Sequence, residues 1–255
     1  MSRYPVRLEL EQLLSTVREL GRKLVYDKSL LGLYHVFEDR EDAGRKLAGL
    51  LRSEVEIPEN SIVFAIPCGG VPVAYVVATE LGIELDLVIC RKILIPWNPE
   101  AGYGAVAPDG TYVLNEALVQ YLGFSEADVR EGIEKTLKEI RRREQVFRGG
   151  RPYPDLRGRS VIVVDDGIAS GYTMLVAARF LKKLGAGKVI VATPTASASS
   201  LKMLSSEVDL LCVVNVRSDV FGFAVADAYR NWYDLSDEEV LEYLSRYRRF
   251  KREQC

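Results

Sequence analysis

The sequence predicts an α/β fold with a mostly parallel central sheet and helices on both of its faces. Short runs rich in Val, Ile and Leu have the length of buried strands, and they occupy residues 61–66, 85–92, 160–166, 188–194 and 208–216. Segments with helical spacing of apolar residues separate most of these runs. Fully apolar strands that alternate with helices are typical of parallel sheets covered on both faces. Ligands bind such sheets beyond the carboxyl ends of their strands.

Helices are expected at residues 8–24, 39–52, 71–81, 172–184 and 197–206. A capping box of Ser125 and Asp128 predicts the start of a long charged helix that reaches about Val146. Ser236 and Glu239 predict the start of a terminal helix in the same way. We therefore expect a helical extension at 1–35, a core at 36–235 and a C-terminal helix at 236–255.

The middle of the chain is expected to leave the parallel pattern. Residues 104–116 predict a hairpin that turns at Pro108, Asp109 and Gly110. The preceding segment, 93–104, contains two prolines and two glycines, so we expect a loop that neither continues a strand nor forms a regular helix.

Composition limits the function classes. The chain has 255 residues, of which 48% are hydrophobic and 27% charged, as in a globular protein. A net charge of −2 gives no broad basic field, so we expect no nucleic-acid partner. No apolar run has the length of a membrane span, and the N-terminus lacks the organisation of a signal peptide, so we expect a cytoplasmic protein without a membrane partner.

Cysteine and histidine usage excludes further classes. Cys68, Cys90, Cys212 and Cys255 lie far apart, which favours reduced thiols over a disulfide framework. The single histidine, His35, argues against a histidine metal site and against a Ser-His-Asp triad.

The most informative segment is residues 161–173, VIVVDDGIASGYT. Its apolar residues predict a buried strand that places Asp165 and Asp166 at the carboxyl end. The small residues that follow lead into a helix, and such a turn points backbone N–H groups at one spot where the helix dipole adds positive potential. Ser170 and Thr173 add hydroxyl donors. The segment thus predicts a site for a ribose 5-phosphate, with its phosphate at the turn and its hydroxyls on the carboxylates.

A simpler interpretation is that the two aspartates end a strand and cap the next helix. The order of strand, acid pair, small-residue turn and Thr favours the functional interpretation, because each part has a mechanical role. The motifs GxxxxGK[ST] and GxGxxG are both absent, which argues against nucleotide hydrolysis and dinucleotide binding.

The segment 161–173 resembles the signature of type I phosphoribosyltransferases, which bind phosphoribosyl diphosphate (PRPP). The chain is similar to a subfamily of predicted phosphoribosyltransferases over about residues 35–245. This similarity lies in segments 37–44, 67–74, 91–92, 113–116, 148–152 and 232–239. The resemblance implies the fold of that family, with a flexible lid and a variable hood over the acceptor, and it implies a homodimer.

The resemblance also implies roles for individual residues. Asp165 and Asp166 are expected to bind the ribose hydroxyls, directly or through Mg²⁺ that arrives with PRPP. The 5-phosphate is expected at Ala169, Ser170, Gly171, Tyr172 and Thr173. The diphosphate is expected at Cys68, Gly69 and Gly70, with neutralisation by Arg91 or Lys92. Lys92 and the two aspartates form the expected catalytic set. A non-proline cis peptide bond is implied in the turn 67–70.

Three further expectations concern Cys68, the lid and the hood. Cys68 occupies a position where members often carry a basic residue, and a small packed thiol is the preferred interpretation for it. The segment 93–104 would be the lid, with Trp97, Glu100 and Tyr103 excluding water, although the two aromatics also suit a surface. The hood would come from residues 195–200 and 216–233, with Phe221 and Phe223 available to stack on a ring.

Basic residues elsewhere receive simpler explanations. Arg141, Arg142 and Arg143 are interpreted as a solvated helix face or a dimer contact, and the basic run at 246–252 as a solvated helix end.

The expected function is transfer of ribose 5-phosphate from PRPP to an acceptor, a purine or related nucleobase. The alternatives are a regulator that senses PRPP without turnover and a structural subunit that binds PRPP.

Overall fold

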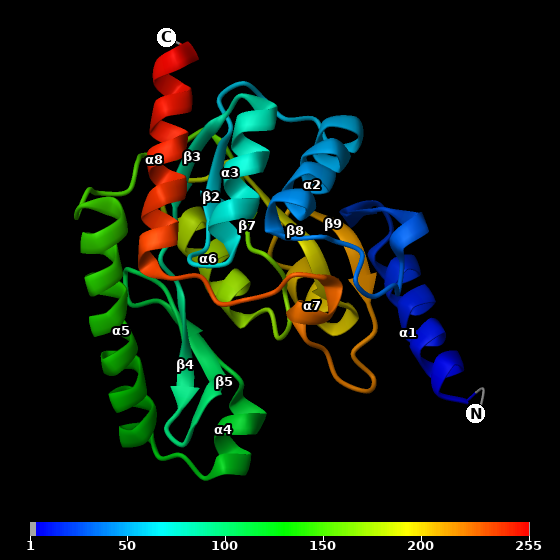
Figure 1. The fold of residues 1–255 in the computed structure, drawn as a ribbon. Coiled ribbons are helices and arrows are strands. Elements are labelled where there is room, and N and C mark those ends of the chain that lie inside the picture. The colour runs from blue at the N-terminus through cyan, green and yellow to red at the C-terminus, as the bar shows by residue number, and fades with distance from the viewer. Residues whose placement is uncertain (1–3, 255) are drawn as a thin grey trace.

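The computed structural model describes residues 4–254. Six parallel strands form its central sheet, in the spatial order β1-β9-β8-β7-β2-β3 (Figure 1). The strands are β1 (Leu24–Tyr26), β2 (Ile62–Ala65), β3 (Glu84–Leu87), β7 (Ser160–Val164), β8 (Lys188–Ser197) and β9 (Leu210–Arg217). The predicted parallel α/β fold is confirmed.

Helices cover both faces of this sheet. They are α1 (Tyr4–Leu20), α2 (Arg40–Glu54), α3 (Gly70–Leu81), α6 (Tyr172–Lys183), α7 (Ala198–Ser205) and α8 (Asp237–Gln254). Helices α4 (Glu116–Leu122) and α5 (Glu126–Arg148) instead pack against the segment 91–106. Helix α5 begins with the predicted capping box of Ser125 and Asp128. Short 3₁₀ turns occupy Gly21–Lys23, Lys28–Leu30 and Val225–Ala228.

Two apolar cores follow from the alternation of side chains along the strands. Val63 and Ile162 point into a core shared with α2, α3 and α8. Their neighbours Ile62 and Val161 point into a second core shared with α1, α6 and α7. No helix among residues 4–254 combines the length and the apolar character that crossing a membrane requires.

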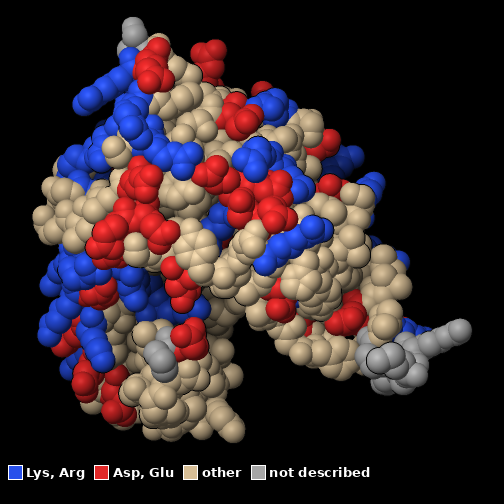
Figure 2. Space-filling view, viewed as in Figure 1, with Lys and Arg blue, Asp and Glu red and all other residues tan. Residues whose placement is uncertain are grey.

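A second, three-stranded antiparallel sheet lies beside the first. It consists of β4 (Arg91–Ile95), β5 (Asn98–Val106) and β6 (Tyr112–Leu114) in the order β4-β5-β6. It extends away from the central sheet next to α5, with α4 near its far end (Figure 1). Figure 2 shows a notch between this lobe and the rest of the molecule, and Lys and Arg side chains gather over α5.

The expectation of an irregular loop at 93–104 is therefore wrong, as is that of one strand over 85–92. Parallel strand β3 stops at Leu87, and Arg91 starts a hairpin of the second sheet. The glycines serve close packing, since a Cβ on Gly104 would come within 2.4 Å of the Val113 carbonyl oxygen. Proline has no backbone N–H to donate in a strand ladder. Pro99 lies where the β4–β5 register shifts, so no regular ladder hydrogen bond is missing there.

The N-terminal region is joined to the core rather than appended to it. Strand β1, inside the expected extension 1–35, pairs in parallel with β9 through Leu24 and Leu211. Among the described residues Cys68, Cys90 and Cys212 are free thiols, and Cys255 lies outside the described range.

Candidate functional site

The acid pair lies at the carboxyl end of β7, at the centre of the sheet. Strand β7 ends at Val164, and Asp165 and Asp166 follow it before α6 begins at Tyr172. The backbone N–H of Asp166 donates to Oδ1 of Asp165 over 2.9 Å. The position matches the edge at which parallel sheets bind ligands.

The turn after β2 packs directly against this pair. A Cβ built on Gly69 would lie 1.9 Å from Oδ2 of Asp166, and one on Gly70 would lie 2.9 Å from Cα of Asp165. Only glycine allows such an approach of backbone to carboxylate. The Pro67–Cys68 peptide bond is cis, as the resemblance implied. Two segments almost 100 positions apart in the sequence thus form one surface.

One backbone N–H group of this turn is hydrogen-bonded within the fold, and two are not. The N–H of Gly70 donates to the Ile66 carbonyl over 3.1 Å and is therefore used within the fold. Within residues 4–254, the N–H groups of Cys68 and Gly69 have no acceptor. These two N–H groups are available to an anion.

The acid pair occupies two different electrostatic settings. Burial, and then the charge of Asp166, raise the pKa of Asp165 well above its ordinary value. The positive charge of Lys92 opposes this shift. Asp166 instead has a direct partner, because Nε of Arg40 lies 2.9 Å from its Oδ2.

Two residues that no sequence motif indicated, Arg40 and Tyr229, also contact Asp166. Arg40 is 6% exposed at the start of α2, donates from Nη1 to the Tyr233 carbonyl over 2.9 Å, and lies under the Trp232 ring at 4.0 Å. The Tyr229 hydroxyl donates to the Asp166 carbonyl over 2.5 Å. The aromatic residues at 229–233 thus hold Arg40 against Asp166.

The segment after the acid pair forms an open turn over the start of α6. The Ser197 hydroxyl donates to the Ala169 carbonyl over 2.7 Å, and Leu175 N–H donates to the Gly171 carbonyl over 2.9 Å. These bonds tie down carbonyls of the turn. The first N–H groups of α6 have no partner within the helix. Ser170 is exposed, and the side chains of Tyr172 and Thr173 are half-buried.

Arg91 and Lys92 begin the hairpin next to the turn 67–70. Nη1 of Arg91 lies 3.4 Å from Oε1 of Glu139 on α5, and Lys92 is exposed. Burial, and then the charge of Arg143, lower the pKa of Arg91. A cavity of about 980 Å³ adjoins Arg91 and Lys92 between the hairpin, α4 and α5. The structure thus provides space beside these cations.

The three expected lid residues have different environments. Trp97 is 67% exposed at the hairpin tip, with its ring 5.6 Å from that of Phe124, and Glu100 is also exposed. Tyr103 is 2% exposed, packs against Gly132 of α5 and lines the same cavity as Arg91 and Lys92, so its role in a lid stays a prediction. Its side chain also anchors the hairpin, because the hydroxyl lies against Gly132 of α5 and the ring centroid is 4.9 Å from that of Phe124.

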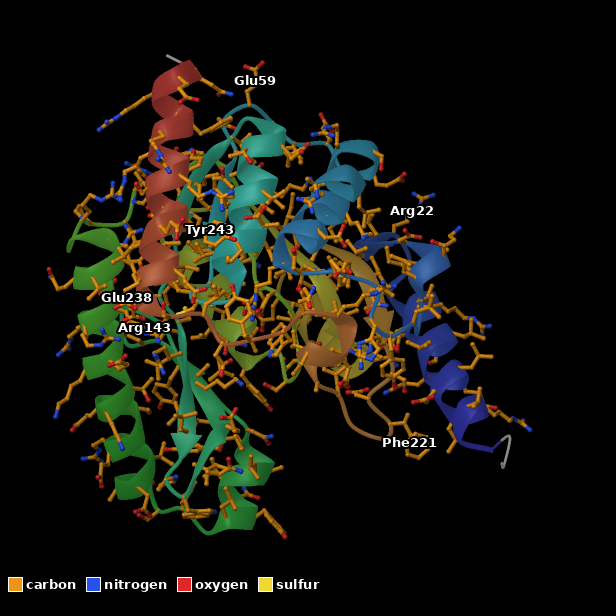
Figure 3. All side chains as sticks on the ribbon, viewed as in Figure 1. Arg22, Glu59, Arg143, Phe221, Glu238 and Tyr243 are labelled. Atoms are coloured by element: carbon orange, nitrogen blue, oxygen red, sulfur yellow. The ribbon has the colours of Figure 1, made fainter. Side chains whose placement is uncertain are left out.

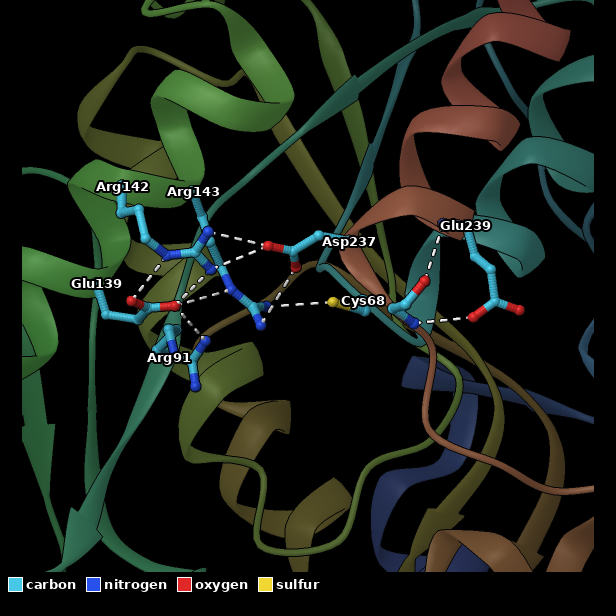
Figure 4. Close-up of polar contacts among 8 residues, drawn as sticks. Cys68, Arg91, Glu139, Arg142, Arg143, Asp237 and Glu239 are labelled. Carbon is cyan, nitrogen blue, oxygen red and sulfur yellow. Dashed lines mark hydrogen bonds and ion pairs between the residues drawn. The ribbon is translucent and has the colours of Figure 1, made fainter.

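Arg143 does not lie on a solvated helix face, which was one of the two interpretations of residues 141–143. Its Nη1 lies 3.2 Å from Sγ of Cys68, so it faces the turn rather than solvent (Figure 4). Burial raises the pKa of the Cys68 thiol, and the Arg143 charge opposes the shift. A charge run on a helix carries no signal for this contact, because 75 positions separate the two residues.

The aromatics of the expected hood are dispersed. Phe221 is 60% exposed on the loop after β9, far from Arg143 and α8 (Figure 3). Phe223 lies against the buried guanidinium of Arg217, with 4.7 Å between Cζ and the ring centroid. Thr195, Ser197 and Ser200 are buried beneath the turn 167–171.

Comparisons with known proteins agree with this architecture. The phosphoribosyl transferase domain family matches residues 37–230. Putative phosphoribosyl transferase Rv0571c of Mycobacterium tuberculosis is 37% identical over 212 residues, which cover 83% of this chain and 47% of the relative. The chain therefore spans about half the length of this relative. Ribose-phosphate pyrophosphokinase of Pyrococcus furiosus is 43% identical over 63 residues, 24% of this chain and 23% of that enzyme.

A solved structure supports the same assignment. The crystal structure of TT1426 from Thermus thermophilus has 32% sequence identity and a TM-score of 0.66, and the match covers 83% of this chain and 98% of that one. The family match spans the acid pair, the turn 67–70 and Tyr229. The chain belongs to the phosphoribosyl transferase domain family.

Proposed function

We propose that the chain binds PRPP and transfers its ribose 5-phosphate to an acceptor, a purine or related nucleobase, with release of diphosphate. The observation that carries this proposal is the contact between the acid pair and the turn 67–70. There Gly69 approaches Asp166 so closely that no side chain fits between them. A sugar diphosphate needs hydroxyl acceptors and diphosphate donors next to each other, and this contact supplies both.

Each part has a defined role in this proposal. Asp165 and Asp166 accept hydrogen bonds from the two ribose hydroxyls. The N–H groups of 169–173 and the hydroxyls of Ser170 and Thr173 bind the 5-phosphate. The N–H groups of Cys68 and Gly69 face the diphosphate, while Gly70 leaves room for the acid pair. Arg91 and Lys92 neutralise the leaving group.

The chemistry is a substitution at C1 of the ribose. A nitrogen of the acceptor forms a bond to C1, the bond from C1 to the diphosphate oxygen breaks, and the acceptor loses a proton to solvent. Positive charge develops on the sugar and negative charge on the diphosphate. Fixed donors around the leaving group stabilise that charge most when water is excluded.

Magnesium fits the site as a companion of the substrate. Residues 4–254 contain no group of three or more His, Cys, Asp or Glu residues that could hold a metal ion. Mg²⁺ needs no such cage, because it keeps waters and binds one or two carboxylates together with phosphates. Asp165 has no cationic hydrogen-bond partner in the described part of the chain, so it is the carboxylate that suits Mg²⁺. When bound, Mg²⁺ would add positive charge at the diphosphate.

The test is incubation with PRPP, Mg²⁺ and a panel of purine and pyrimidine bases, followed by measurement of diphosphate release. We expect release that depends on one class of base and falls at least about 100-fold in Asp166→Asn. Binding of PRPP without release for any base would support a regulator instead. We further propose that the chain forms a homodimer, which light scattering checks.

A further inference from the structure

Three arginines and two carboxylates meet where α5, β4 and the start of α8 converge (Figure 4). Arg142 bonds Asp237 over 3.0 Å, and Glu139 accepts from Arg91, Arg142 and Arg143. Within residues 4–254, the ion pairs of these three guanidiniums go to two carboxylates, Glu139 and Asp237, so positive charge exceeds negative charge in the cluster. The cluster lies beside the turn 67–70, through the contact of Arg143 with Cys68.

The N–H of Arg143 that faces the turn has a weak acceptor. Its side chain is 17% exposed, and its Nη1 is 3.2 Å from the Cys68 sulfur. A thiol is a poor hydrogen-bond acceptor, and burial keeps this one protonated by raising its pKa. The hydrogen bond from Nη1 of Arg143 to this sulfur is therefore weak, and an anion would be a stronger acceptor for the same N–H.

Arg91 and Arg143 also share one oxygen. Oε1 of Glu139 lies 3.4 Å from Nη1 of Arg91 and 3.3 Å from Nε of Arg143. The charge of Arg143 lowers the pKa of Arg91, so the two guanidiniums repel each other. An anion that contacts both would relieve this repulsion.

The turn itself carries no cation. Residues 67–70 are Pro, Cys, Gly and Gly, and the two free N–H groups belong to Cys68 and Gly69. The nearest guanidinium that reaches this turn comes from α5. It shares Oε1 of Glu139 with the guanidinium of Arg91.

We propose that Arg143 is the diphosphate-binding cation of the turn 67–70, supplied from α5 in place of a basic side chain on the turn. This proposal rests on the proposed function. With Arg91, Arg143 binds the terminal phosphate, and the Cys68 sulfur holds its guanidinium in position until the phosphate arrives. Arg is suited to this task because its planar fork donates two parallel bonds to one phosphate.

The alternative is that Arg143 only joins α5 to α8. Asp237, the first residue of α8, lies 3.0 Å from Arg142 but 3.7 Å from Nη2 of Arg143. The link between the helices is thus mainly made by Arg142, whose side chain is 47% exposed. Arg142 is therefore the matched control, because it shares Glu139 and Asp237 but does not contact Cys68.

The experiment is calorimetric titration of the full chain with inorganic diphosphate and Mg²⁺, with PRPP and Mg²⁺, and with ribose 5-phosphate. We expect Arg143→Gln to weaken diphosphate and PRPP binding by about 10- to 100-fold, since a charge-assisted hydrogen bond contributes that much. Binding of ribose 5-phosphate should change by less than about twofold, and Arg142→Gln should change diphosphate binding by less than about threefold.

A rescue variant tests whether the positive charge of Arg143, and not its packing, accounts for diphosphate binding. Adding Cys68→Lys to Arg143→Gln should restore most of the diphosphate affinity, because the cation then comes from the turn. If that double variant does not fold, Arg143→Lys replaces it in the test. We expect its affinity for diphosphate to lie between those of the wild type and Arg143→Gln.

Two outcomes overturn the proposal without touching the proposed function. One is unchanged diphosphate affinity in Arg143→Gln while the wild type binds PRPP. The other is an equal loss for diphosphate and ribose 5-phosphate together with a lower Tm, which identifies a structural role. A wild type that binds neither PRPP nor ribose 5-phosphate would instead end the proposed function.

Discussion

At the scale of single residues, the surroundings of Asp165 oppose its negative charge. Burial and the neighbouring Asp166 raise its pKa well above the ordinary range. The folded state therefore holds this proton more tightly than the unfolded state. The resulting stabilisation is complete below the unfolded-state pKa and is lost as the pH rises through the folded-state pKa. A substrate that binds an ionised Asp165 thus uses a charge that the fold alone disfavours.

Asp165→Asn should consequently stabilise the ligand-free protein near neutral pH while abolishing its turnover. The difference in Tm between variant and wild type should be small below the unfolded-state pKa of about 4 and should grow as the pH rises through the folded-state pKa. Thermal unfolding in metal-free buffer across this range measures it. A difference that is independent of pH would show that the ionisation of Asp165 is not responsible.

The residues that could be predicted from the sequence are those within one motif. Asp165 and Asp166 follow a run of four apolar residues, so strand, carboxyl end and ligand edge follow from local pattern alone. Arg40 and Arg143 reach the site from helices 126 and 75 positions away from their partners. Their contacts depend on how α2 and α5 pack against the sheet. The local sequence around a basic residue on an amphipathic helix does not indicate which distant residue it contacts.

At the scale of elements, the hairpin β4–β5 shows why composition misled the prediction. Proline and glycine indicate a loop when they act through backbone freedom. Here Pro96 lies in the turn between Ile95 and Asn98, and Gly104 allows β6 to approach. Strand β1 was missed for a different reason, because three residues are too few for any periodic signal.

Two variants of the hairpin distinguish a role in excluding water from a role in stabilising the fold. Trp97→Ala, at the exposed tip, should leave stability within about 0.5 kcal/mol. It should lower turnover at least about tenfold while PRPP affinity changes less, because a tip that excludes water acts during transfer. Tyr103→Ala should instead destabilise the protein by about 3–5 kcal/mol, since its ring is buried against α5.

Steady-state kinetics, PRPP titration and denaturant unfolding measure the three quantities for both variants. Equal loss of binding and turnover in Trp97→Ala would mean that the hairpin only binds substrate. A Tyr103→Ala protein of normal stability would contradict the anchoring role.

At the scale of the whole molecule, the site depends on layers that do not touch the ligand. The turn at Gly171 rests on Ser200 and Met203 of α7, and α7 in turn packs against α1. Leu13 of α1 belongs to the same apolar core as Leu175 and Leu201 of α6 and α7. The N-terminal helix is thus part of the support beneath the proposed phosphate turn.

Two neighbouring leucines of α1 test this integration. Leu13 is 5% exposed and Leu14 is 50% exposed. Leu13→Ala should lower the free energy of unfolding by about 2–5 kcal/mol, because it leaves a cavity in the core beneath α7. Leu14→Ala should change it by less than about 0.5 kcal/mol. Denaturant unfolding, followed by fluorescence and circular dichroism, should show one transition in both variants. A separate early transition in Leu13→Ala, with the main one unchanged, would instead make α1 an independent extension. If Leu13→Ala weakens the binding of ribose 5-phosphate and Leu14→Ala does not, the packing of α1 against α7 stabilises the turn at Gly171.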